Sequence, residues 1–92
     1  RRHLQGLAGV ERALIFGSYA SSSDAPDSDI DVLIVGSPDR DDLTDRLESA
    51  GREVGRPVNE VVFSEHELRS RRGRGDRFIQ SMEQGPVVPL LP

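Results

Sequence analysis

The fold of this chain is decided by residues 16–35, which read FGSYASSSDAPDSDIDVLIV. Residues 30–35 are β-branched and apolar apart from one aspartate, which predicts a strand. An earlier strand, at residues 10–16, ends on an apolar run that Gly17 closes. The serine, alanine, aspartate and proline residues between the strands predict a short helical turn after Gly17 and then a loop. If Gly17 and Asp29 serve one site, the two strands must run antiparallel.

Hydrophobic spacing and capping residues place the remaining elements. Apolar residues recur every three or four positions in residues 38–54, which predicts a helix with Ser37 as its cap and Pro38 as its first residue. Ser64 and Glu67 form an S-x-x-E capping box that begins another helix. We also expect the end of a helix at residues 1–8, a strand at 58–63, a helical stretch capped by Asp76 and stopped at Gly85, and an apolar tail at 87–91. The pattern indicates an α/β (α+β) domain with a small, mixed three-stranded sheet flanked by helices.

Composition restricts the classes of protein to which this chain can belong. The chain has 92 residues, of which 35% are hydrophobic, and this allows one small domain with a thin core. It contains no cysteine, which excludes disulfides, thiolate zinc sites and cysteine nucleophiles. Its apolar runs are far shorter than the roughly 20 residues of a membrane span, so we expect a cytoplasmic protein without a membrane partner. Because the sequence begins with Arg1, we expect residues 1–92 to be one domain from a longer chain.

Charge is distributed unevenly along the chain, whose net charge is −4. Residues 24–48 carry nine acidic residues and two arginines, whereas residues 69–77 carry five arginines and one aspartate. This balance argues against nonspecific nucleic-acid binding by the whole domain. An acidic cluster is usually a solvated surface, so only the spacing of its members can indicate a site.

Two aspartates in this cluster have a spacing that suits metal binding. Asp29 and Asp31 lie two positions apart at the start of a strand, so both carboxylates point to the same face. Such a pair repels itself unless a cation lies between the two groups, and hard oxygen ligands suit Mg²⁺ or Mn²⁺. Gly17 and Ser18 end the preceding strand, where a tight turn and the free amides of a helix start can hold an anion. The alternative for Asp29 and Asp31 is that they are two solvent-exposed acids. The alternative for Gly17 and Ser18 is that they only end the strand and cap a helix.

The order of these residues resembles the signature of the polymerase-beta-type nucleotidyltransferase superfamily, and it looks most like the minimal nucleotidyltransferases. The matching segments are Phe16-Gly17-Ser18-Tyr19-Ala20 and Asp27-Ser28-Asp29-Ile30-Asp31-Val32-Leu33-Ile34-Val35, with the spacing G-S-x10-D-x-D. The resemblance implies that Gly17 and Ser18 hold the terminal phosphates of a nucleoside triphosphate, and that Asp29 and Asp31 are catalytic and bind metal. The segments at residues 56–63 and 85–91 also resemble the corresponding segments of family members in which this domain follows an N-terminal winged-helix module.

The resemblance further implies a third catalytic carboxylate on the strand at residues 58–63. The best-matching position holds Asn59, which is uncharged and cannot act as a base. Glu60 is the nearest acid, and regular alternation points it to the opposite face unless a bulge shifts the strand by one residue. Glu60 is therefore a candidate catalytic residue on the condition of a bulge, and otherwise an acid on the strand surface.

Taken together, the resemblance implies a Mg²⁺- or Mn²⁺-dependent transfer of a nucleoside monophosphate, with ATP as the expected donor and a protein or small molecule as acceptor. The alternative is a catalytically weak or inactive nucleotide-sensing domain of a DNA-binding regulator, which the uncharged Asn59 favours. A third reading is a structural dimerisation domain with an acidic loop. The partners that the resemblance suggests are a HEPN-type protein, a fused DNA-binding module or a second copy of the chain.

Overall fold

The computed structural model describes residues 4, 6–17 and 29–90. In chain order, the elements are the strands β1 (Val10–Phe16) and β2 (Ile30–Gly36), the helix α2 (Arg40–Val54), the strand β3 (Val58–Phe63), the helices α3 (Glu65–Gly73) and α4 (Arg77–Gln84), and the short strand β4 (Val88–Pro89). The predicted strands and helices in the described part of the chain are therefore present. The helical turn expected from Ser18 lies outside the described residues, as do residues 1–3 and 5 of the expected helix at 1–8.

The sheet is mixed and has four strands rather than the three that were predicted. Its order is β3-β2-β1-β4, with β2 parallel to β3 and antiparallel to β1. The antiparallel β1–β2 pair is the arrangement required for Gly17 and Asp29 to meet. The extra strand comes from the apolar tail, where Val88 and Pro89 pair with β1. A two-residue strand that contains proline carries no readable alternation, so only its pairing partner reveals it.

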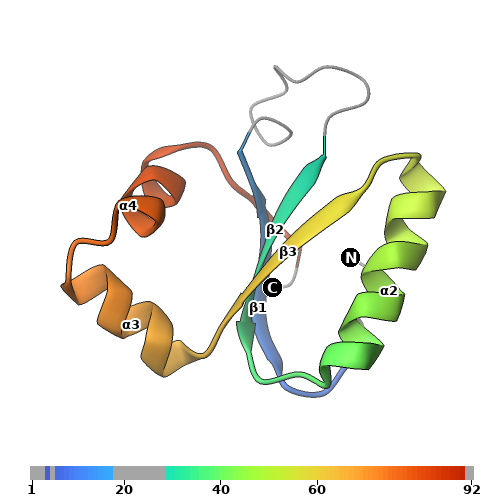
Figure 1. Ribbon diagram of the computed structural model, residues 1–92, viewed down its shortest axis with the longest axis horizontal. Coiled ribbons are helices and arrows are strands. Elements are labelled where there is room, and N and C mark those ends of the chain that lie inside the picture. The colour runs from blue at the N-terminus through green and yellow to red at the C-terminus, as the bar shows by residue number, and fades with distance from the viewer. Residues whose placement is uncertain (1–3, 5, 18–28, 91–92) are drawn as a thin grey trace.

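Helices cover both faces of the sheet (Figure 1). The first core lies between the sheet and α2, and it contains the buried residues Leu4, Leu7, Ala13, Ile30, Val32, Ile34, Leu43 and Leu47. The second core lies under α3 and α4, and it contains the buried residues Leu33, Val35, Phe63, Leu68, Ile79 and Met82. Alternate residues of β2 thus belong to opposite cores, which explains why this strand is apolar along nearly its whole length.

The caps of the three helices mostly follow the sequence prediction, with one correction. Asp39, rather than Ser37, caps α2, and its side chain accepts a hydrogen bond from the Asp42 amide at 2.9 Å. The amide of Ser37 donates instead to the Gly9 carbonyl at 2.8 Å, so the backbone of Ser37 is hydrogen-bonded to the segment before β1. The prediction that a helix begins at Ser64 is confirmed, because the Ser64 hydroxyl accepts a hydrogen bond from the Glu67 amide at 3.0 Å.

None of the helices among the described residues has the length and the hydrophobicity that spanning a bilayer requires.

Candidate functional site

The candidate site begins where β1 ends against the start of β2. Phe16 pairs with Asp31 in the antiparallel ladder, so the next residue, Gly17, lies beside the Asp31 side chain. Gly17 has a φ of 78°, which side chains other than glycine rarely adopt. A Cβ atom built on Gly17 would lie 2.9 Å from Oδ2 of Asp31. Glycine is thus required twice here, for the backbone turn and for the space that the carboxylate occupies.

The second half of the site joins β2 to β3. Asp31 and Asn59 are register partners in the parallel ladder, and the Nδ2 atom of Asn59 donates a hydrogen bond to Oδ2 of Asp29 at 2.7 Å. Asp29 and Asn59 are exposed, and Asp31 is half-buried. Two carboxylates from the start of β2 and one amide from the start of β3 therefore lie together, next to Gly17 at the end of β1, on the sheet face that α3 and α4 partly cover.

Glu60 does not join this group. The pairing of β2 with β3 runs without a register shift from Ile30 to Val35, so the bulge that would turn Glu60 inward is absent from this ladder. Glu60 is the register partner of Val32, and Val32 belongs to the core under α2. The structure thus places Glu60 on the face opposite Asn59, because side chains alternate along a strand.

The residues present fit a divalent cation through two carboxylates and an amide oxygen. Asp29 and Asp31 supply the hard oxygen donors that Mg²⁺ prefers, and the side chain of Asn59 can add its amide oxygen if it turns over. The space at Gly17, which a Cβ would fill, leaves Oδ2 of Asp31 unhindered. No group of three or more His, Cys, Asp or Glu side chains with metal-binding geometry is found among the described residues, and the third position of this site holds Asn59. Ser18, the other predicted phosphate-binding residue, lies outside the described residues.

A pocket that the sequence did not reveal lies next to Gly17. It has a volume of about 420 Å³ and is lined by Phe16, Gly17, Phe78, Ser81, Met82, Gly85 and Pro86. The ring of Phe78 lies edge-on to that of Phe16, with 5.5 Å between the centroids, and this contact fixes α4 against the end of β1. From the sequence we expect only a helical stretch that is capped by Asp76 and stopped at Gly85. That this helix adjoins the end of β1 depends on tertiary packing.

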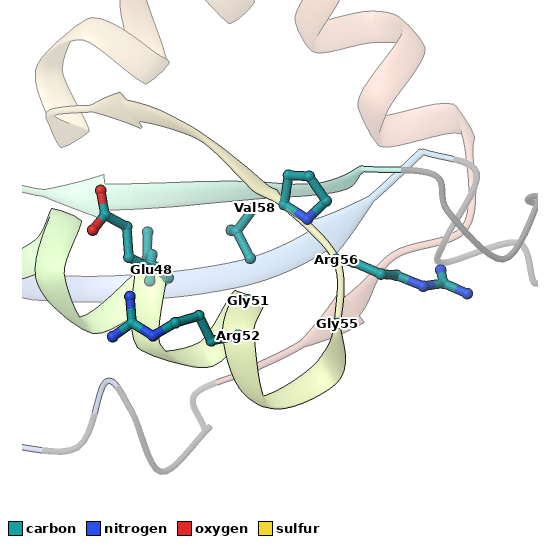
Figure 2. Close-up of a pocket in the computed structure, with 8 residues that line it drawn as sticks. Glu48, Gly51, Arg52, Gly55, Arg56 and Val58 are labelled. Atoms are coloured by element: carbon teal, nitrogen blue, oxygen red, sulfur yellow. The ribbon is translucent and has the colours of Figure 1, made fainter.

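A second pocket, of about 410 Å³, lies on the other face of the sheet, where α2 ends and β3 begins (Figure 2). Val58 is one of its lining residues and packs against the core under α2. The pocket contains the charged residues Glu48, Arg52 and Arg56, lies on the opposite face of the sheet, and shares no lining residue with the candidate site. It is therefore separate from the candidate site.

Two arginines of the basic segment at residues 69–77 are engaged within the fold. Arg71 pairs with Glu67 and Asp76, each at 3.1 Å, and its guanidinium lies 4.7 Å from the centroid of the Phe63 ring. The hydrogen bond to Glu67 raises the pKa of Arg71, with a smaller contribution from Asp76. Arg72 pairs with Glu83 at 2.7 Å, and this hydrogen bond raises the pKa of Arg72.

The junction between α3 and α4 stabilises the carboxylate of Asp76. It caps α4 by accepting a hydrogen bond from the Ile79 amide at 3.1 Å. That backbone hydrogen bond lowers the pKa of Asp76, and the hydrogen bond from Arg71 lowers it further. The pair of Arg71 and Asp76 thus joins the end of α3 to the start of α4, and helps to hold the wall of the pocket beside Gly17.

Comparison with known proteins gives a family and a relative. The chain matches the family model described as "Nucleotidyltransferase domain" over residues 1–84. It is 33% identical over 79 residues to a protein of Methanocaldococcus jannaschii named "Putative protein adenylyltransferase", and the aligned part covers 86% of this chain and 78% of that relative. No solved structure gives a significant match. The antiparallel β1–β2 pair, the paired aspartates and both matches lead to one conclusion: the chain belongs to the nucleotidyltransferase domain family, as a minimal nucleotidyltransferase-like domain.

Proposed function

We propose that this domain binds a nucleoside triphosphate, with ATP as the donor, together with Mg²⁺, and transfers the nucleoside monophosphate to an acceptor hydroxyl. The observation that supports the proposal is the position of Asp31, whose Oδ2 occupies the space that a Cβ on Gly17 would need, so that the two halves of the G-S-x10-D-x-D pattern lie side by side. The name of the archaeal relative, which specifies adenylyl transfer to protein, supports ATP as the donor and a protein as the acceptor.

In this proposal, residues at the end of β1, at the start of β2 and on β3 have different roles in the transfer. In the transfer, the acceptor oxygen bonds to the α-phosphorus while the bond from that phosphorus to the oxygen bridging it to the β-phosphorus breaks, and pyrophosphate leaves. Asp29 and Asp31 would hold the divalent cation, which neutralises charge on the phosphate oxygens. The open backbone at Gly17 would admit the terminal phosphates. Attack in line with the leaving group then places the acceptor on the β3 side of the aspartates, near Asn59.

Asn59 determines how fast this transfer can be. An amide cannot accept the acceptor's proton, and it adds no negative charge to the cation site. The hydrogen bond to Asp29 holds that carboxylate in position instead, at 2.7 Å. We therefore expect nucleotide binding with slow transfer, in which the acceptor's proton passes to solvent.

A second candidate function is nucleotide sensing without transfer, which the same Asn59 favours. Transfer of label from α-³²P-ATP, measured with Mg²⁺ and an added acceptor protein, distinguishes the two. Under the enzyme proposal, Asn59→Asp raises label transfer and Asp31→Ala abolishes it. If ATP binds in a Mg²⁺-dependent way but neither the natural chain nor Asn59→Asp transfers label, the domain is a sensor. If ATP does not bind at millimolar concentration, both functions are wrong.

A further inference from the structure

We propose that the pocket between the end of β1 and α4 holds the nucleobase of the bound nucleotide. This inference rests on the proposed function, and it assigns a base-binding role to Phe78 and Ser81 of α4. The pocket shares Gly17 with the candidate site, so the pocket and the site adjoin at the end of β1.

The lining suits a flat, largely apolar ring. Its volume of about 420 Å³ lies in the range of small-molecule sites. Phe78 is 37% exposed, an uncommon state for a phenylalanine, and two edge-on contacts with Phe16 and Phe63 hold its ring. A ring held in this way offers a surface on which a base can stack at little entropic cost. The hydroxyl of Ser81 adds a polar group that can hydrogen-bond to a heteroatom of the base.

The position of the pocket favours the nucleotide over the acceptor as its occupant. The acceptor and the pyrophosphate must lie on opposite sides of the α-phosphorus. Asn59 marks the β3 side of the aspartates, whereas the pocket lies on the β1 side, beside Gly17. An acceptor side chain in this pocket would therefore approach from the side of the leaving group. The ribose and base instead extend off the sheet face toward α4, the helix that carries Phe78.

The test compares two ligands that differ in whether they contain a base. Binding of ATP and of inorganic tripolyphosphate is measured by calorimetry with Mg²⁺ for the natural chain, Ser81→Leu and Gln80→Leu. Ser81 and Gln80 are exposed neighbours on α4, but only Ser81 lines the pocket. Leucine is also a better helix former than serine, so Ser81→Leu should keep its fold, which a thermal melt checks. Phe78→Leu, which keeps an apolar side chain but removes the ring, is a second variant.

The expected result is a loss of affinity that affects ATP alone. Ser81→Leu and Phe78→Leu should each weaken ATP binding at least about fivefold, the weaker end of base–aromatic stacking. Both should leave tripolyphosphate binding unchanged, and Gln80→Leu should change neither. Unchanged ATP affinity in Ser81→Leu overturns the proposal, and if label transfer to an acceptor protein is lost at the same time, the pocket belongs to the acceptor. Failure of the natural chain to bind either ligand refutes the proposed function itself, whereas equal affinity for both ligands refutes the base pocket alone.

Discussion

Replacing Asn59 with aspartate tests the geometry of the site most directly. The amide nitrogen of Asn59 lies 2.7 Å from Oδ2 of Asp29, so Asn59→Asp converts a hydrogen bond into a contact between two carboxylates. Both groups are exposed, and at about 4 Å in water two such charges repel each other by about 1 kcal/mol. Loss of the hydrogen bond adds up to about 1 kcal/mol. Without a divalent cation, the free energy of unfolding should therefore fall by roughly 1–2 kcal/mol, which lowers the Tm of a domain this size by about 5–15 °C.

Mg²⁺ should reverse this loss, because a cation between the carboxylates removes their repulsion and stabilises the folded state that binds it. The assay is thermal unfolding in EDTA and in Mg²⁺, followed by circular dichroism. Asn59→Ala isolates the lost hydrogen bond, and Gln80→Glu makes the same amide-to-carboxylate change at an exposed position on α4. The reasoning is refuted if Asn59→Asp is no less stable than Asn59→Ala in EDTA, or if Mg²⁺ raises the Tm of all the variants equally.

Three other predictions follow from the described residues. Gly17→Ala and Gly55→Ala each place a side chain at a positive φ and should each cost about 1–2 kcal/mol of stability in urea unfolding. Only Gly17→Ala should also weaken Mg²⁺-ATP binding, because a Cβ at Gly17 would approach Asp31, whereas no described residue lies within 4 Å of a Cβ at Gly55. Glu60→Ala should leave label transfer from ATP within about twofold of the natural chain, because Glu60 faces away from the aspartates, and a complete loss of transfer would contradict this placement. The fold lowers the pKa of Asp76, so its stabilising effect is complete at neutral pH and is lost as the pH falls below about 4; urea midpoints between pH 2 and pH 6 should drop less steeply in Asp76→Asn, and equal slopes would show that Asp76 does not contribute to the acid sensitivity.

Much of the fold and half of the site could be predicted from the sequence, because the signals are local. The apolar run at residues 30–35 and the turn at Gly17 specify two strands through side-chain branching and backbone freedom alone. The spacing of Asp29 and Asp31 places both carboxylates on one face in any regular strand. The side chains of Ser64 and Asp76 cap their helices through hydrogen bonds that span only three residues, so these helix starts could also be predicted.

Only the tertiary structure could decide between Asn59 and Glu60. The two residues are neighbours, and a bulge of one residue would exchange their faces without changing the sequence pattern. The parallel register of β3 with β2 is unbroken, so Asn59 lies on the face of the aspartates and Glu60 on the opposite face. This register depends on the packing of Val58 and Val62 into one core and of Val61 and Phe63 into the other. Such packing involves residues distant in sequence, so no local pattern encodes it.

The sequence by itself thus determined the order of the strands along the chain, the helix starts at Ser64 and Asp76, and the pair of aspartates. The tertiary structure decided the fourth strand, the cap of α2 at Asp39 and the pocket beside Gly17. The physical reason is the range of the interactions. Caps, turns and alternation act within a few residues, whereas the pairing of β4 with β1 and the packing of Phe78 on Phe16 join segments more than 60 residues apart. Whether two such segments meet is set by burial of the whole core, which no short stretch of sequence records.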